Sequence, residues 1–154
     1  NFNCPGQTVI AGAAGAVEKA CAALKEAGAK RAIMLNVSAP FHSSLMEPAA
    51  QKLKKVLDKI EIKDAEIPVI ANVNALAETK AADIRTHLVE QAAHAVRWEE
   101  SMRNLIAGGM DTMVECGPGT VLSGFMRKID KSIVSYHAEN IETIIETVQA
   151  LKGV

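Results

Sequence analysis

Short β-type runs alternate with helical segments along most of this chain. The runs at 31–37, 67–73, 111–116 and 132–136 each predict a strand, and each precedes a segment whose apolar residues recur at helical spacing. An earlier run at 8–11 precedes a helix predicted over 16–27, which Gly28 ends. Strands that alternate with helices pack as a parallel sheet with covering helices, so the pattern favours an α/β fold. A chain of 154 residues can bury a core of its own.

Composition excludes several classes of function. The formal net charge is −1 with no basic stripe, and aromatic residues make up 3% of the chain, so nucleic-acid binding is not expected. No apolar run approaches the roughly 18 residues of a membrane span. Cys4, Cys21 and Cys116 form no C-x-x-C pair, which predicts reduced thiols and a cytoplasmic protein. His87 and His94 lack a metal-ligating residue four positions on, so no metal site is expected.

The residue best placed for chemistry is His42. It lies in the segment VSAPFHSSLM, where a β-type run leads into Pro40 and two serines open an amphipathic helix. Histidine titrates close to neutral pH, so a fixed imidazole at such a corner suits general acid/base work. The alternative is a histidine that caps the helix or bonds a loop carbonyl. Ser44 and Glu47 predict a capping box at the start of this helix.

Two other segments have a functional and a structural interpretation. Gly117-Pro118-Gly119 could cradle a phosphate at a helix N-terminus, but it matches no complete nucleotide motif and a tight turn is favoured. The segment NFNCPGQ at the start of the chain predicts a turn, in which Asn3 or Gln7 could bond a bound acyl group or the loop that carries the base. The sequence contains no G-x-S-x-G elbow that would supply a serine nucleophile.

Taken together, four segments resemble the malonyl-CoA:acyl carrier protein transacylase family. Their order and spacing agree with the family over the whole chain, although Ala92 and Ala95 stand where the family usually has Leu and Pro. The resemblance covers only the C-terminal half of a family member. The matching segments are residues 1–12 (N-x-N-x-P-G-Q-x-V-I-A/S-G), 37–46 (V-S-x-P-F/S-H-x-x-L-M), 91–98 (Q-L-x-x-P-V-x-W) and 114–122 (E-x-G-P-G-x-V-L).

The resemblance implies a fold and a division of the chain. The family combines an α/β-hydrolase-like sheet with a small ferredoxin-like α+β subdomain. By this likeness, residues 1–37 form the later part of the ferredoxin-like subdomain, and residues 38–154 form the C-terminal part of the α/β acyltransferase subdomain. The chain starts without Met, as if in mid-domain, which predicts that it is a piece of a longer protein.

The resemblance also implies a reaction. A malonyl group passes from CoA to the phosphopantetheine thiol of acyl carrier protein through an acyl-serine, in fatty acid biosynthesis, with no further cofactor. His42 is the implied catalytic base and acid, oriented by the main-chain carbonyl of Arg97, while Asn3 and Phe41 shape the site. The serine, the arginine that pairs with the malonyl carboxylate and the oxyanion segment would lie in the missing N-terminal half, so this chain alone is expected to be inactive.

Two alternatives remain open. The chain could come from the acyltransferase module of a polyketide synthase, in which the pair Phe41-His42 would favour malonyl. It could instead be a non-catalytic fragment that docks a carrier protein, since it lacks a nucleophile.

Overall fold

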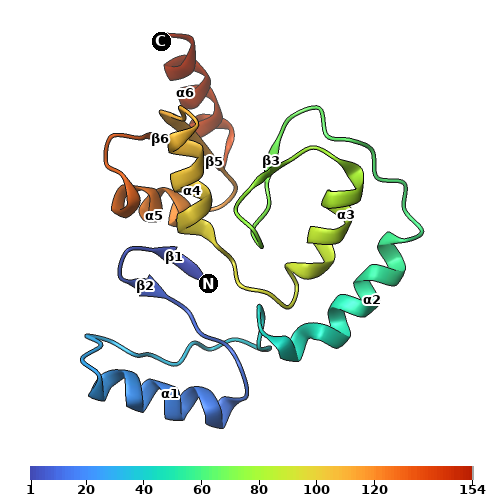
Figure 1. The fold of residues 1–154 in the computed structure, drawn as a ribbon. Coiled ribbons are helices and arrows are strands. Elements are labelled where there is room, and N and C mark those ends of the chain that lie inside the picture. The colour runs from blue at the N-terminus through green and yellow to red at the C-terminus, as the bar shows by residue number, and fades with distance from the viewer. Residues whose placement is uncertain (154) are drawn as a thin grey trace.

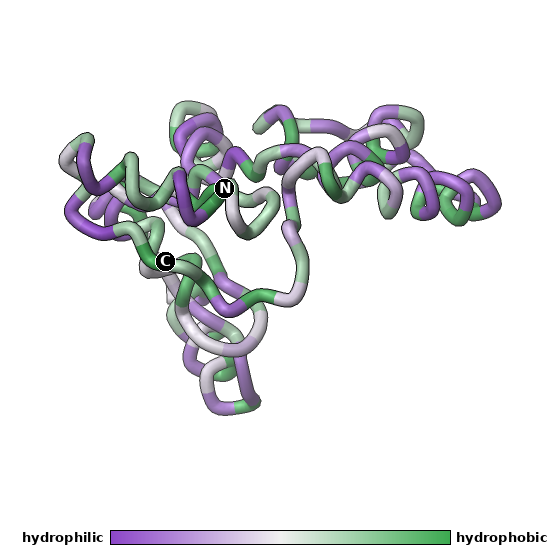
Figure 2. The backbone as a smooth tube through the Cα atoms, turned by 90° about the horizontal axis from the view of Figure 1, so that it is seen from below, coloured by the Kyte–Doolittle hydropathy of each residue, from purple (hydrophilic) through white to green (hydrophobic). Residues whose placement is uncertain are grey.

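The computed structural model describes residues 1–153, which contain six α-helices and three two-stranded sheets (Figure 1). The α/β class expected from the alternating pattern is confirmed. Within the described part of the chain, no helix is long and apolar enough to cross a membrane. Hydrophilic and hydrophobic residues alternate along the backbone, as Figure 2 shows.

The best-packed part is the C-terminal unit, residues 98–152. Strands β5 (Thr112–Cys116) and β6 (Val134–Ala138) pair in parallel with Thr112 opposite Val134, and helix α5 (Val121–Ile129) connects them. Helix α6 (Ile141–Lys152) packs on β6, and α4 (Trp98–Ala107) packs on α5. The core between these elements consists of Met102, Met126 and Ile133, covered by Trp98, Leu105, Ile106, Met110, Met113 and Ile129.

The Gly117-Pro118-Gly119 segment is a tight turn between β5 and α5. Gly117 and Gly119 have φ of 128° and 78°, a left-handed region that glycine adopts readily. The buried carboxylate of Glu115 accepts hydrogen bonds from the backbone N–H groups of Leu122 and Ser123, at 2.9 and 2.8 Å. Because a side chain of the protein already satisfies these helix N-terminal donors, the turn interpretation holds over the phosphate one.

The middle of the chain holds two short strands and two helices. β3 (Val69–Ile70) pairs antiparallel with β4 (Ala77–Glu78), and α2 (Glu47–Leu57) packs beside α3 (Ala81–Glu90). The strand predicted over 67–73 is wrong in extent, because only Val69–Ile70 form a strand, and Val69 is 53% exposed. The cause is a turn: the N–H of Ala71 donates to the carbonyl of Leu76, which reverses the chain after two strand residues.

The first part of the chain begins with a hairpin. β1 (Phe2–Cys4) and β2 (Gln7–Thr8) are joined at Gly6, whose φ is 76°, so the predicted turn is confirmed. β1 lies against α4 and α5 of the C-terminal unit. Helix α1 (Ala14–Glu26) follows, and Gly28 with φ of 94° ends it. The subdomain boundary at residue 37 stays a prediction.

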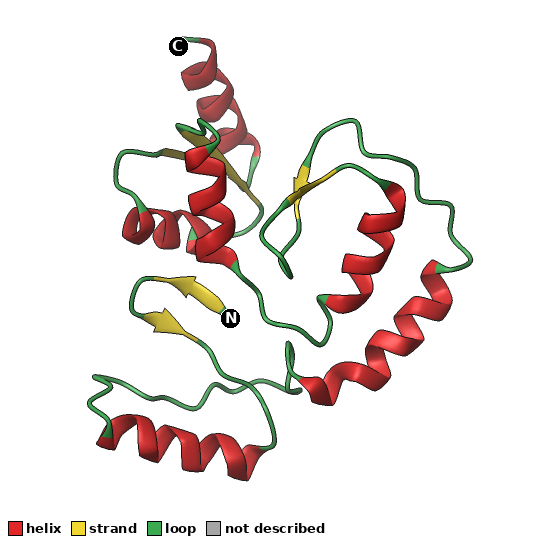
Figure 3. Cartoon of the chain, in the orientation of Figure 1, coloured by secondary structure: helices red, strands yellow, loops and turns green. Residues whose placement is uncertain are grey.

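Residues 31–37 contradict their predicted strand. They form a loop (Figure 3) and pair with no strand among residues 1–153. The side chains of Ile33, Leu35 and Val37 are 56–61% exposed. A strand needs a neighbouring strand whose backbone groups pair with its own. No such strand lies beside residues 31–37 in the described chain.

Candidate active site

His42 stands on a strained turn just before the short 3-10 helix η1 (Ser44–Met46). Its backbone φ is 59°, in the left-handed region that costs an ordinary residue free energy and that histidine visits more readily than most. The hydroxyl of Ser43 donates to the carbonyl of Pro40 at 2.7 Å, across the turn. The predicted Ser44–Glu47 capping box is absent, because the 3-10 turn separates Ser44 from the start of α2. His42 is half-buried.

Two backbone carbonyls hold the imidazole. Nδ1 of His42 lies 2.9 Å from the carbonyl oxygen of Gln91 and 3.2 Å from that of His94. A carbonyl oxygen only accepts, so Nδ1 carries the hydrogen and donates it. The neutral imidazole then keeps its lone pair on Nε2, the nitrogen left to take a proton from a reacting group.

The family resemblance implies that the carbonyl of Arg97 orients His42, but in the structure the carbonyls of Gln91 and His94 bond Nδ1 instead. Arg97 lies at the start of α4, where its carbonyl accepts from the N–H and the hydroxyl of Ser101, both at 2.9 Å. Helix α3 ends at Glu90, so the carbonyls just beyond it have no helical partner. Gln91 and His94 therefore supply the carbonyls, and the end of the preceding helix is the sequence signal that points to Gln91.

The loop that carries these carbonyls, residues 91–97, is fixed by two other parts of the chain. The N–H of Phe2 donates to the carbonyl of Val96 at 2.8 Å, and the N–H of Arg97 donates to the carbonyl of Asn72 at 2.9 Å. β1 and the turn after β3 thus converge on the loop that orients His42.

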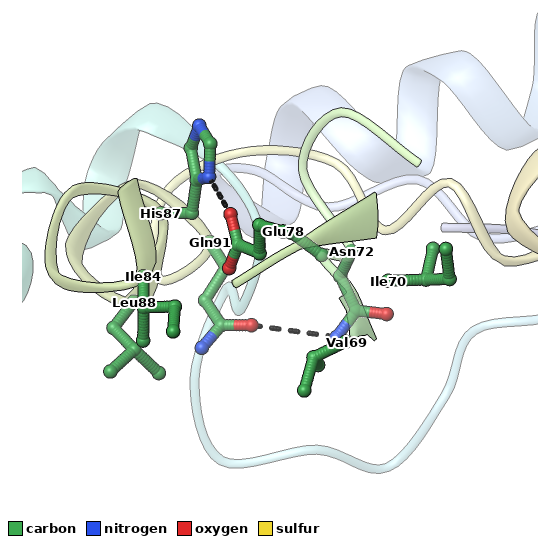
Figure 4. Close-up of a pocket in the computed structure, with 9 residues that line it drawn as sticks. Val69, Ile70, Asn72, Glu78, Ile84, His87, Leu88 and Gln91 are labelled. Atoms are coloured by element: carbon green, nitrogen blue, oxygen red, sulfur yellow. Dashed lines mark hydrogen bonds and ion pairs between the residues drawn. The ribbon is translucent and has the colours of Figure 1, made fainter. Parts of the chain in front are cut away.

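A pocket lies on the α3 side of this loop, between β3 and α3 (Figure 4). Gln91 lines it with its side chain, whose Oε1 accepts from Nδ2 of Asn72 at 3.4 Å. His87 and Glu78 also line the pocket, and Nδ1 of His87 bonds the carboxylate of Glu78 (Figure 4). Gln91 therefore belongs to two environments, because its carbonyl faces His42 and its side chain faces the pocket.

The structure also locates the two residues expected to shape the site. Asn3 is half-buried in β1, the strand that bonds the 91–97 loop through Phe2. Phe41 is 50% exposed and directly precedes His42. No hydrogen bond between the Asn3 side chain and His42 occurs within residues 1–153, and the roles of Asn3 and Phe41 stay predictions.

The chain matches a known protein family over almost its whole length. The acyl transferase domain family matches residues 1–149. The malonyl CoA-acyl carrier protein transacylase of Bacillus subtilis (strain 168) is 53% identical over 152 residues, covering 99% of this chain and 48% of the relative. The protein of the same name from Escherichia coli (strain K12) is 48% identical over 129 residues, covering 84% of this chain and 42% of the relative.

Solved structures have the same fold over the same region. The crystal structure of MCAT from Streptococcus pneumoniae superposes with a TM-score of 0.92 at 41% identity, covering 97% of this chain and 49% of that one. A malonyl-transacylase in complex with its type II PKS acyl-carrier protein gives 0.85 at 39% identity, covering 89% and 44%. The chain spans about half the length of the curated relatives it matches. With the acyl transferase family matching residues 1–149 of 154, the chain belongs to the acyl transferase domain family.

Proposed function

We propose that this chain supplies the histidine half of a site that transfers a malonyl group from CoA to acyl carrier protein through an acyl-serine, in fatty acid biosynthesis. The observation that carries the proposal is the pair of carbonyls, from Gln91 and His94, that hold Nδ1 of His42. The names of the relatives from B. subtilis and E. coli support the substrate and the carrier protein.

In the first half-reaction, Nε2 of His42 takes the proton of a serine hydroxyl as its oxygen attacks the malonyl thioester carbon. The oxygen–carbon bond forms, the carbon–sulfur bond breaks, and the imidazolium returns its proton to the leaving CoA sulfur. In the second half-reaction, Nε2 takes the proton of the phosphopantetheine thiol, which attacks the acyl-serine. The imidazolium then protonates the departing serine oxygen. No cofactor besides these substrates enters the steps.

The carbonyls take the part that a carboxylate takes in a Ser-His-Asp triad. They fix the tautomer of the imidazole, and their negative ends face Nδ1–H when His42 becomes an imidazolium. The serine, the arginine for the malonyl carboxylate and the oxyanion donors would come from a complementary N-terminal half. That the chain spans about half of its relatives supports this division. Asn3 and Phe41 would shape the site near His42.

A second candidate is the malonyl-transacylase of a polyketide pathway. The structural likeness to a malonyl-transacylase in complex with its type II PKS acyl-carrier protein favours it. The chemistry at His42 would be the same and the carrier protein would differ. A non-catalytic fragment that docks a carrier protein is the alternative from another class.

The test is reconstitution. The chain is mixed with the N-terminal half of the B. subtilis relative, and malonyl transfer from CoA to carrier protein is followed by mass spectrometry of the carrier. We expect transfer by the mixture and no acyl-enzyme on this chain alone. An acyl-enzyme on this chain alone would reveal a nucleophile within it and overturn the division into halves. Transfer to a polyketide carrier protein only would favour the second candidate.

A further inference from the structure

The turn that presents His42 is closed by a side chain. No backbone hydrogen bond joins two residues of the 38–43 segment in the described structure. The bond that spans the turn is the one from the Ser43 hydroxyl to the Pro40 carbonyl, at 2.7 Å. Ser43 is itself anchored to the next element, because its carbonyl accepts from the N–H of Met46 at 2.9 Å.

The hydrogen bond between Ser43 and Pro40 spans the one strained residue of the 38–43 segment. His42 lies between Pro40 and Ser43 with φ of 59°, whereas Ser43 has an extended backbone with φ of −129° and ψ of 164°. A left-handed residue persists only where its surroundings enforce the conformation. Without the Ser43–Pro40 bond, His42 could relax to negative φ, which would swing the imidazole away from the carbonyls of Gln91 and His94.

From this geometry we infer that Ser43 is a positioning residue for His42. Its hydroxyl holds the turn in the conformation that keeps Nδ1–H on the two carbonyls and leaves Nε2 free. The inference rests on the proposed function for its catalytic consequence, but the effect on the His42 imidazole is a property of this chain alone.

Three variants test the inference. Ser43→Ala removes the hydroxyl. Ser43→Thr keeps it on a β-branched side chain, which an extended backbone accommodates well. Ser44→Ala is the matched control, because Ser44 is the neighbouring serine, is exposed, and makes no side-chain hydrogen bond within residues 1–153.

The first measurement is the tautomer of His42, from long-range proton–nitrogen NMR spectra of the full chain at a pH where the imidazole is neutral. The unaltered chain, Ser43→Thr and Ser44→Ala should show the Nδ1–H form. Ser43→Ala should shift toward the Nε2–H form that a free histidine side chain favours. The methionine-core signals of the C-terminal unit report in each sample whether the variant is folded.

The second measurement is malonyl transfer by the reconstituted mixture. Loss of one hydrogen bond that fixes the base should lower kcat about tenfold in Ser43→Ala, with KM for malonyl-CoA unchanged and Ser43→Thr restoring the rate. An unchanged tautomer in folded Ser43→Ala, or an equal effect of Ser44→Ala, would overturn the role of Ser43. If no mixture transfers malonyl, the proposed function fails, and the tautomer measurement still decides whether Ser43 positions His42.

Discussion

The C-terminal unit and the arm before it differ in how far their apolar residues are buried. In the C-terminal unit, residues 98–152, Met102, Met126 and Ile133 are buried to 8% exposure or less. In the arm formed by residues 10–60, helix α1 has no buried residue and helix α2 buries only Ala50. Apolar side chains at helical spacing form helices in both regions. Neighbouring elements bury those of the C-terminal unit, whereas α1 and α2 leave Leu24, Leu53 and Val56 exposed.

His42 stands at the junction of these two regions. The arm carries it, while the loop that holds its imidazole leads directly into α4 of the C-terminal unit. The geometry of the site therefore depends on how the weakly packed arm is held against the well-packed unit. Variants that separate the stability of the unit from that of the arm test this comparison.

The largest effect on stability should come from the core. Met126 is fully buried, so Met126→Ala should lower the free energy of unfolding by about 2–5 kcal/mol through lost contacts and a cavity. Leu24 in α1 is 43% exposed, and Leu24→Ala should cost less than about 1 kcal/mol. Urea unfolding followed by circular dichroism measures both. Equal losses would contradict the contrast between unit and arm.

A smaller effect should come from Glu115, which is 7% exposed. Burial by itself raises the pKa of this carboxyl, but hydrogen bonds from Ser123 and Leu122, together with the charge of His137, outweigh it and hold the pKa below its usual value. A carboxyl whose folded pKa is lowered stabilises the fold above its unfolded pKa, and this stabilisation is lost as the pH falls through the folded pKa.

The variant Glu115→Gln should therefore cost about 1–3 kcal/mol at neutral pH and progressively less in acid. Unfolding free energies measured between neutral and acidic pH provide the check. Glu146→Gln, at an exposed position of α6, is the matched control and should cost little at any pH. A deficit in Glu115→Gln that is independent of pH would mean that the charge of Glu115 contributes nothing.

The smallest effect should come from a helix end. Asn140 caps α6, since its side chain accepts from the N–H of Thr143 at 3.0 Å and Thr143 reciprocates in a capping box. Asn140→Ala should cost about 1 kcal/mol, whereas Ala13, which precedes α1, makes no side-chain cap that could be lost. Thermal unfolding of Asn140→Ala, compared with Ala13→Gly, would show this difference. An equal or larger loss in Ala13→Gly would contradict it.

The sequence predicts the elements whose signals are local. Gly28 ends its helix as expected, and β5 (Thr112–Cys116) matches the run at 111–116 within one residue. β6 (Val134–Ala138) overlaps the run at 132–136 but begins and ends two residues later. The segments 31–37 and 67–73 were predicted less well, because a strand depends on partners that are distant in sequence. Residues 31–37 have none in the described chain, and a turn interrupts the other run at Ala71.

Some features of the candidate site can also be predicted from local sequence, and others depend on distant parts of the chain. His42 could be singled out from its own segment, and the acyl transferase family from the four motifs. The carbonyls that orient His42 could not be identified from the sequence, because they depend on where α3 ends and how the following loop turns back. The sequence predicts Ser43 as part of a helix start, whereas its hydroxyl bonds the carbonyl of Pro40, a contact that depends on how the turn folds in three dimensions.

The most direct test of the central claim is malonyl transfer by the reconstituted mixture with His42→Ala. His137→Gln, in β6, serves as the control, since this histidine bonds neither Gln91 nor His94. If His42 is the general base, transfer from CoA to carrier protein should fall by at least about 100-fold in His42→Ala and stay near the original rate in His137→Gln. Full transfer by the His42→Ala mixture would contradict the account.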